Sequence, residues 1–181
     1  MAASLTGKFL LATAKLLDPN FAQTVILLIR HDAQGAFGFV INRPTDLMVA
    51  DALGGVLDDA GHIDSPIYFG GPCQGPLFVL HRDAGIGGEN PMPGVHLTTD
   101  RDAIEALLVA GADPAKFFGT YSGWSPDQLE AELAEGSWLV YDGTAEDAFS
   151  TDDRLWQKLN ARIHLSKYMP PERIPDDPSV N

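Results

Sequence analysis

Cysteine is nearly missing from this chain of 181 residues, in which Cys73 stands alone. A single cysteine excludes a disulfide within the chain and a structural zinc site built from cysteines, and it fits a reducing compartment. No apolar stretch approaches the ~18 residues that a membrane span needs. The start of the sequence also lacks the basic and apolar regions of a signal peptide. We therefore expect a cytoplasmic protein without membrane contact.

Basic side chains are scarce, since 12 Lys and Arg stand against 25 Asp and Glu, for a net charge of −13. Affinity for phosphate backbones comes largely from Lys and Arg, so we expect no direct binding of nucleic acid. Residues Asp127 to Asp153 contain nine of the acids and no Lys or Arg. A solvated face that aids solubility explains this segment better than a docking surface for a basic partner does.

Common catalytic and cofactor motifs are absent. The one Gly-Lys pair, Gly7-Lys8, is followed by Phe9 and so does not form a phosphate-binding loop. Ser122 stands one place too late for a Gly-x-Ser-x-Gly nucleophile elbow. The histidines have no metal-ligand spacing; they are His31, His62, His81, His96 and His164. We therefore name no catalytic residue, no metal site and no cofactor.

The first half of the chain predicts β-structure. Residues Phe9 to Ala12 form a short apolar run, and Val25 to Ile29 form an unbroken one that is typical of a strand covered on both faces. The loop from His31 to Gly35 then reverses the chain into a strand over Ala36 to Ile41, which predicts a hairpin. Gly38 within that strand indicates a bulge or a close backbone approach.

The remaining elements follow from periodicity and capping signals. We expect a short helix over Thr45 to Leu53, strands over Pro66 to Phe69 and Leu77 to His81, and a loop over Gly85 to Gly94. Further strands are expected over Lys116 to Thr120 and Trp138 to Tyr141. The expected helix starts are Thr99 with Asp102, Ser125-Pro126, and Ser150 with Asp153. Strands early and helices late predict one α+β domain over 1–168. The proline-rich residues 169–181 are expected to be a partly ordered tail.

The candidate binding site combines two motifs. In Gly70-Gly71-Pro72 successive backbone N–H groups could converge on an anion, and in Asn42-Arg43-Pro44 the guanidinium could bind a carboxylate or phosphate. Together they would hold an acidic small molecule. The simpler interpretation is that Gly-Gly-Pro forms a tight turn and that Arg43 pairs with a local carboxylate.

Two neighbouring features could extend this site. Cys73 could be a reactive thiol with His81 facing it, although unpaired cysteines are more often small buried residues. Tyr121, Gly123 and Trp124 stand where a strand meets a helix and could line a pocket; aromatic core packing is the simpler account.

The ordered motifs of the chain resemble the YqgE/AlgH family of bacterial proteins. They are Leu16-Leu17-Asp18-Pro19-Asn20-Phe21, Thr24-Val25-Ile26, His31, the run from Gly35 to Pro44, Gly70-Gly71-Pro72, Val79-Leu80-His81, Tyr121-Ser122-Gly123-Trp124, Gln128 to Leu133, and Trp138. The match extends from about Leu5 to the last helix. Membership implies an α+β fold in which a bent, branching sheet forms a pseudo-barrel flanked by helices.

The resemblance implies little about function, because the family is largely uncharacterised. Our first hypothesis is a binding or regulatory protein without catalytic activity that acts through a small molecule or a protein partner. One alternative is the family's label of transcriptional regulator acting on DNA, for which the sequence shows no helix-turn-helix pattern. The other is an enzyme that uses the Gly-Gly-Pro loop with Cys73 and His81.

Overall fold

The computed structural model describes residues 3–54, 63–111 and 113–166, which form ten strands and five helices. The strands are β1 (Phe9–Ala12), β2 (Val25–Asp32), β3 (Gly35–Val40), β4 (Pro44–Met48), β5 (Pro66–Tyr68), β6 (Cys73–His81), β7 (Glu89–Met92), β8 (Val95–Thr98), β9 (Ala115–Trp124) and β10 (Trp138–Tyr141). The helices are α1 (Val49–Leu53), α2 (Arg101–Ala110), α3 (Gln128–Ala134), α4 (Ala145–Phe149) and α5 (Leu155–Ser166). The expected tail at 169–181 lies outside the described residues.

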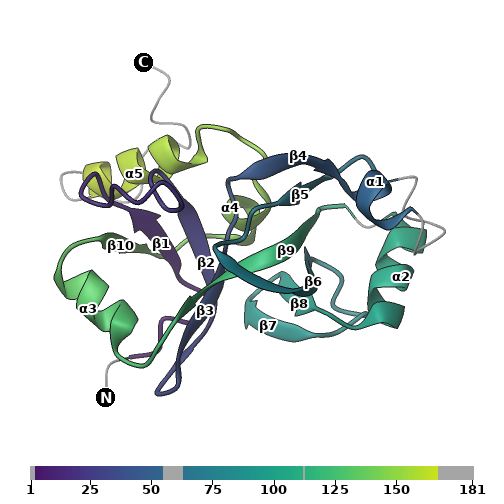
Figure 1. The fold of residues 1–181 in the computed structure, drawn as a ribbon, viewed down its shortest axis with the longest axis horizontal. Helices are drawn as coiled ribbons and strands as arrows, with labels where there is room; N and C mark the ends of the chain where they lie inside the picture. The colour runs from purple at the N-terminus through teal and green to yellow at the C-terminus, as the bar shows by residue number, and fades with distance from the viewer. Residues whose placement is uncertain (1–2, 55–62, 112, 167–181) are drawn as a thin grey trace.

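Strand β2 is the centre of the first half of the sheet, between β1 and β3 (Figure 1). All five side chains from Val25 to Ile29 are fully buried, because alternate members pack into two separate apolar clusters on the two faces. This confirms the expected strand and its hairpin with β3. Gly38 lies opposite Leu28, next to a register shift, and a Cβ there would meet the Leu27 carbonyl oxygen at 2.4 Å. The close approach expected at Gly38 is thus confirmed.

Strand β9 joins the two halves of the sheet and makes it branch. Its last residues pair with β3, while Phe117 and Phe118 pair with β5 on one edge and with β6 on the other. Figure 1 shows β9 running through the centre, with β1, β2, β3 and β10 to one side and β6, β7 and β8 to the other. The main strand order ends at β10 and β7, so the described sheet is open. The α+β class and the branching sheet are confirmed.

The connection from β5 to β6 explains the Gly-Gly-Pro motif. Since these strands pair with opposite edges of β9, the chain between them crosses β9 within four residues. A Cβ on Gly70 would lie 2.1 Å from the Thr120 carbonyl oxygen, and one on Gly71 would lie 2.4 Å from that of Tyr121. Gly71 also has a φ of +149°, which side chains rarely allow. At Gly70 and Gly71 the chain crosses the β9 backbone so closely that a side chain has no room.

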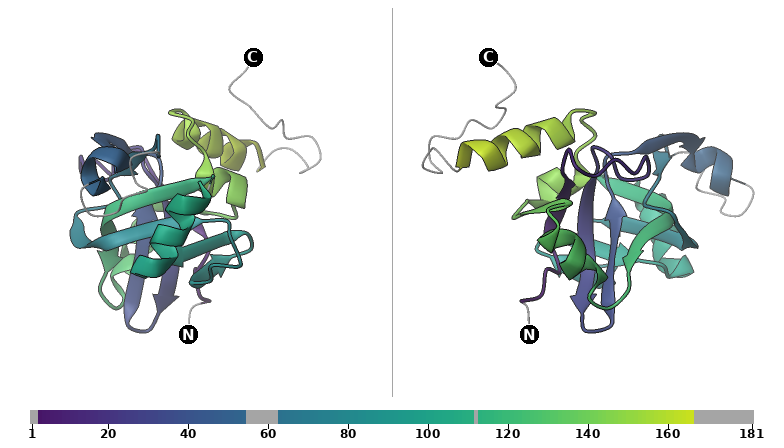
Figure 2. Two further views of the ribbon diagram at one scale, coloured as in Figure 1. Left: turned by 90° about the vertical axis from the view of Figure 1, so that its right-hand side faces the viewer. Right: turned by 60° about the vertical axis from the view of Figure 1, so that its left-hand side comes forward.

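Helices cover the sheet from several sides (Figure 2): α3 and α5 lie beside the half that holds β1 and β10, and α2 lies at the far end of the other half. Helix α2 begins after Asp100, whose side chain accepts a hydrogen bond from the Ala103 N–H, and it ends at Gly111 in a left-handed conformation. The helix is as expected, but Asp100 rather than Thr99 is its cap.

Three expectations about element bounds are wrong. The helix expected over Thr45 to Leu53 is mostly strand β4, because the chain there pairs with β5, and only Val49–Leu53 is helical. The loop expected from Gly85 to Gly94 contains β7, which pairs with β8. The last helix begins at Leu155 rather than near Ser150, since Ser150 ends the separate helix α4, which Thr144 opens with a capping box.

Replacing Gly71 by alanine tests the crossing. We expect Gly71→Ala to lower the free energy of unfolding by more than about 2 kcal/mol, because the new Cβ meets backbone atoms and φ is positive. Gly119→Ala, in neighbouring β9, is the control, since its Cβ has no atom within 4 Å among the described residues. Urea denaturation of both variants gives the comparison. Equal stabilities would contradict the crossing as a constraint.

Candidate functional site

The side chains of Asn42 and Arg43 form hydrogen bonds with the backbone of the loop that leads into β2. Arg43 Nη1 donates hydrogen bonds to the carbonyl oxygens of Pro19 (2.9 Å) and Asn20 (2.7 Å), and its Nη2 donates to that of Ala22 (2.7 Å). Three carbonyl acceptors therefore hold the guanidinium, and burial lowers the pKa of Arg43. The fork expected to bind an anion stabilises the loop that precedes β2.

Asn42 holds the end of the same loop. Its Oδ1 accepts a hydrogen bond from the Val25 N–H at 2.8 Å, and its Nδ2 donates to the Gln23 carbonyl at 3.0 Å. Gln23 has a φ of +58°, a conformation that costs energy for a residue with a side chain, so these bonds hold a strained turn. Pro44 begins β4 and lies opposite Tyr68.

Gly70, the first residue of the Gly-Gly-Pro motif, forms hydrogen bonds with residues of β3 and β9. The Gly70 N–H donates to Thr120 Oγ1 at 3.0 Å. The Gly70 carbonyl accepts from Ser122 Oγ at 2.9 Å and from the Val40 N–H at 2.8 Å. Pro72 is exposed beside the crossing. The Gly70 amide is therefore not free for an anion, and the motif serves the branch point of the sheet.

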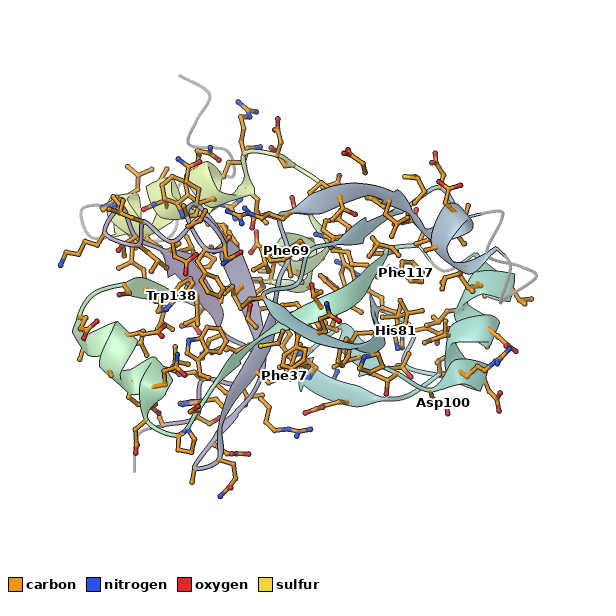
Figure 3. All side chains as sticks on the ribbon, in the orientation of Figure 1. Phe37, Phe69, His81, Asp100, Phe117 and Trp138 are labelled. Atoms are coloured by element: carbon orange, nitrogen blue, oxygen red, sulfur yellow. The ribbon has the colours of Figure 1, made fainter. Side chains whose placement is uncertain are left out.

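Cys73 and His81 lie at the two ends of β6. Eight residues of strand place them roughly 25 Å apart. Cys73 lies opposite Tyr121 and is half-buried; His81 lies opposite His96 and is fully buried. Burial lowers the pKa of His81, followed by the effect of neighbouring His96. Figure 3 shows His81 well away from Phe69, which precedes the Gly-Gly-Pro motif. The structure does not bring this thiol and imidazole together.

The aromatic residues at the end of β9 pack into the fold. The Tyr121 ring lies edge-on to Phe37, with ring centroids 5.2 Å apart. The Trp124 and Trp138 indole N–H groups both donate to Glu132 Oε2, at 2.9 and 2.7 Å. Gly123 lies between these aromatics in β9. Core packing, the simpler account of these residues, agrees with the geometry.

The sequence interpretation missed Lys116, the second residue of β9. Its side chain is 2% exposed. Its Nζ donates hydrogen bonds to the carbonyl oxygens of Ile41 (2.7 Å) and Ser150 (2.6 Å), and it lies 4.6 Å from the centroid of the Tyr68 ring. A signal was present, since a single charge interrupts an apolar strand, but we interpreted that strand without asking where its charge would lie.

A cavity of about 380 Å³ borders Lys116. Apolar rings contribute to its lining, and two exposed carboxylate residues also line it on the solvent side. We call it the Lys116 cavity; the residues that matter for its chemistry are Lys116, Tyr68, Phe117, Phe149, Asp64 and Asp113. Figure 3 shows Phe117 on the side of β9 that leads towards α2. Of the described residues, these form the best candidate for a ligand site.

Burial lowers the pKa of Lys116 from 10.5 to about 7. Desolvation favours the neutral amine, and no carboxylate pairs with Lys116 among the described residues to oppose it. The other predicted site residues show no comparable combination of burial, cavity and titratable group. The Lys116 cavity is thus the place in the described fold where a binding site and an unusual side chain coincide.

Several acids of the segment from Asp127 to Asp153 form ion pairs or hydrogen bonds with other side chains. Four of its acids pair with cations, and two more accept hydrogen bonds from His31 or from tryptophans. The contacts are Asp142 with Lys8, Glu146 with Arg82, Asp147 with Arg162, Asp152 with Lys158, Glu130 with His31, and Glu132 with Trp124 and Trp138. These contacts tie the segment to several parts of the fold.

Comparison with known proteins now places the fold. The model of the AlgH-like family matches residues 9–167. The chain belongs to the AlgH-like family. A UPF0301 protein of Chlorobaculum tepidum is 36% identical over 182 residues, covering 97% of this chain and 95% of the other. One of Streptomyces coelicolor is 38% identical over 188 residues, covering 99% and 96%.

Solved structures agree with this AlgH-like assignment. The solution structure of the AlgH protein from Pseudomonas aeruginosa superposes with a TM-score of 0.73 at 30% identity, covering 94% of this chain and 96% of the other. A crystal structure from Corynebacterium diphtheriae has a TM-score of 0.68 at 20% identity, covering 94% and 90%, which shows the fold alone. Every helix in the described part of the chain is too short or too polar to span a membrane.

Replacing Arg43 tests its structural role. We expect Arg43→Ala to lower the free energy of unfolding by about 1–3 kcal/mol, because three carbonyls lose a charged donor. Arg43→Lys is the matched control: it keeps the charge but not the fork, so we expect only partial recovery. Chemical denaturation measures both. Unchanged stability of Arg43→Ala would contradict the role.

The pKa of Lys116 predicts a pH dependence of stability. Between pH 7 and 10.5 the unfolded chain holds a proton on Lys116 that the folded chain lacks, so the free energy of unfolding rises with pH across this window. The rise should reach roughly 5 kcal/mol at about 1.4 kcal/mol per pKa unit. Denaturation at several pH values should show it in the native protein but not in Lys116→Met. Parallel profiles would contradict it.

Proposed function

We propose that this AlgH-like protein is a cytoplasmic binding protein without catalytic activity, and that it acts through a small molecule held in the Lys116 cavity. The observation that supports this is a buried amine beside a hollow of about 380 Å³, a size within the range of ligand pockets. The Arg43 guanidinium and the Gly70 N–H also bind other parts of the fold, and neither residue is among those that line this cavity.

The cavity favours a particular ligand chemistry. Tyr68, Phe117 and Phe149 supply apolar contact. Ile41 and Ser150 accept from two N–H groups of Lys116, so the ammonium form has a third N–H for a carbonyl oxygen and the neutral form has a lone pair for a carbonyl carbon. Asp64 and Asp113 line the cavity on the solvent side, where they favour an amino group or another donor. Two carboxylates disfavour an anion. The ligand is therefore a small, mostly apolar carbonyl compound, neutral or cationic, rather than the acidic molecule that the Arg43 hypothesis favoured.

Neither alternative from the sequence gains support. An enzyme using Cys73 and His81 needs the two groups in contact, and β6 separates them. A regulator that binds DNA directly needs a basic surface, whereas the chain carries a net charge of −13. A regulatory effect exerted through a bound small molecule agrees with both observations.

A fragment screen tests the proposal. Neutral carbonyl fragments are screened by ligand-observed NMR against the native protein, Ser65→Leu and Arg43→Ala. Ser65 lines the cavity, so leucine there should fill it and weaken binding at least tenfold. Arg43→Ala should bind the same fragments as the native protein. Loss of binding in Arg43→Ala, or full binding in Ser65→Leu, would move the site away from Lys116.

A further inference from the structure

We propose that Lys116 is a nucleophilic amine that captures small aldehydes and ketones as an imine within the Lys116 cavity. This rests on the proposed function, since it concerns the same cavity and names the reaction of its buried side chain. Three independent observations support it: the hydrogen bonds of Nζ, the absence of a carboxylate partner among the described residues, and the adjoining cavity.

The hydrogen bonds of Nζ suit a neutral amine. A neutral amine has two N–H groups and one lone pair, whereas an ammonium has three N–H groups and no lone pair. Two carbonyl oxygens accept from Nζ, those of Ile41 at 2.7 Å and Ser150 at 2.6 Å. The two acceptors match the two N–H groups of the neutral form, which leaves its lone pair for an electrophile.

Ion pairing distinguishes Lys116 from other lysines of the chain. Lys8 and Lys158 pair with Asp142 and Asp152, and these carboxylates stabilise their charged forms. Among the residues that the structure describes, no carboxylate lies within ion-pair distance of Lys116 Nζ. A lysine is a nucleophile only as the free amine. The Tyr68 ring, 4.6 Å from Nζ, stabilises the ammonium, but burial without a carboxylate partner outweighs it and favours the free amine.

The resulting reactivity is large at neutral pH. With a pKa of about 7, about half of Lys116 is the free amine at pH 7. An ordinary lysine with a pKa near 10.4 is free in only roughly one molecule in 2,500. Nζ lies against the Tyr68 ring and the Ser150 carbonyl, and Tyr68 and Thr151 line the cavity with Lys116, so a small molecule held there would lie beside this buried amine.

The reaction balances without an oxidant or a reductant. The Nζ lone pair attacks the carbonyl carbon, a C–N bond forms, and the carbonyl π electrons move to oxygen. A proton passes from nitrogen to that oxygen, which gives a carbinolamine. Loss of the hydroxyl group with the second amine proton releases water and leaves the C=N bond. If the imine takes up a proton, its single N–H can still donate to one of the two carbonyls, Ile41 or Ser150.

Reductive trapping tests the capture. The native protein is incubated with propanal and cyanoborohydride, and the propylated lysines are located by peptide mass spectrometry. We expect Lys116 to be labelled first at pH 7, with a rate that rises with pH to a plateau above about pH 7. Pyruvate should label Lys116 at least tenfold more slowly than propanal, because Asp64 and Asp113 repel its carboxylate.

Three variants serve as controls. Lys116→Arg removes the nucleophile but keeps hydrogen-bond donors, and it should abolish the fast label while its circular dichroism spectrum stays native. Ser65→Leu keeps the amine but fills the cavity, so its labelling of Lys116 should fall at least tenfold. Lys15→Arg removes an exposed lysine and should leave the fast label unchanged.

The possible outcomes distinguish covalent capture by Lys116 from the proposed function, which is the binding of a small molecule in the Lys116 cavity. If exposed lysines are labelled and Lys116 is not, while neutral fragments still bind the native protein and not Ser65→Leu, then covalent capture is wrong and the binding site stands. If the fragments fail to bind as well, both proposals are wrong. Labelling of Lys116 that Ser65→Leu does not slow would also overturn the capture, since the reagent would then reach Nζ by another route.

Discussion

The passage of the chain across β9 is the constraint on which the rest of the structure depends. Gly70 and Gly71 lie so close to the β9 backbone that a Cβ on either would clash with a carbonyl. The crossing lets β5 and β6 take opposite edges of β9, and it leaves the last residues of β9 free to pair with β3. Without it β5 and β6 could not both pair with β9.

Lys116 connects the same region to the helical part of the chain. From β9 its amine reaches the carbonyl of Ile41, which follows β3, and that of Ser150, which follows α4. A buried amine without a carboxylate partner is costly when charged, so the fold shifts it towards the neutral form. The side chain that ties these segments together therefore also carries the lowered pKa beside the cavity.

Local signals predicted most of the fold. The apolar run of β2, the hairpin loop and the presence of helix α2 each depend on neighbouring residues, so the sequence revealed them, although the cap of α2 is Asp100 rather than Thr99. Bounds failed where distant pairing decides the outcome: β4 is a strand because β5 lies beside it, although its sequence resembles the start of a helix. The bonds of Arg43 could not be predicted for the same reason, since its acceptors lie more than twenty residues earlier in the chain.

By itself, the sequence determined the family, the α+β class, the acidic balance and the positions of Gly38, Gly70 and Gly71, because each depends on residue type and order along the chain. Only the tertiary structure decided which polar groups are occupied and which adjoin a cavity. Arg43 and Lys116 are both single cations near strands, yet one stabilises a loop and the other lies buried beside a hollow. Their difference comes from the atoms that long-range pairing places around each, and burial and hydrogen bonding act through those atoms.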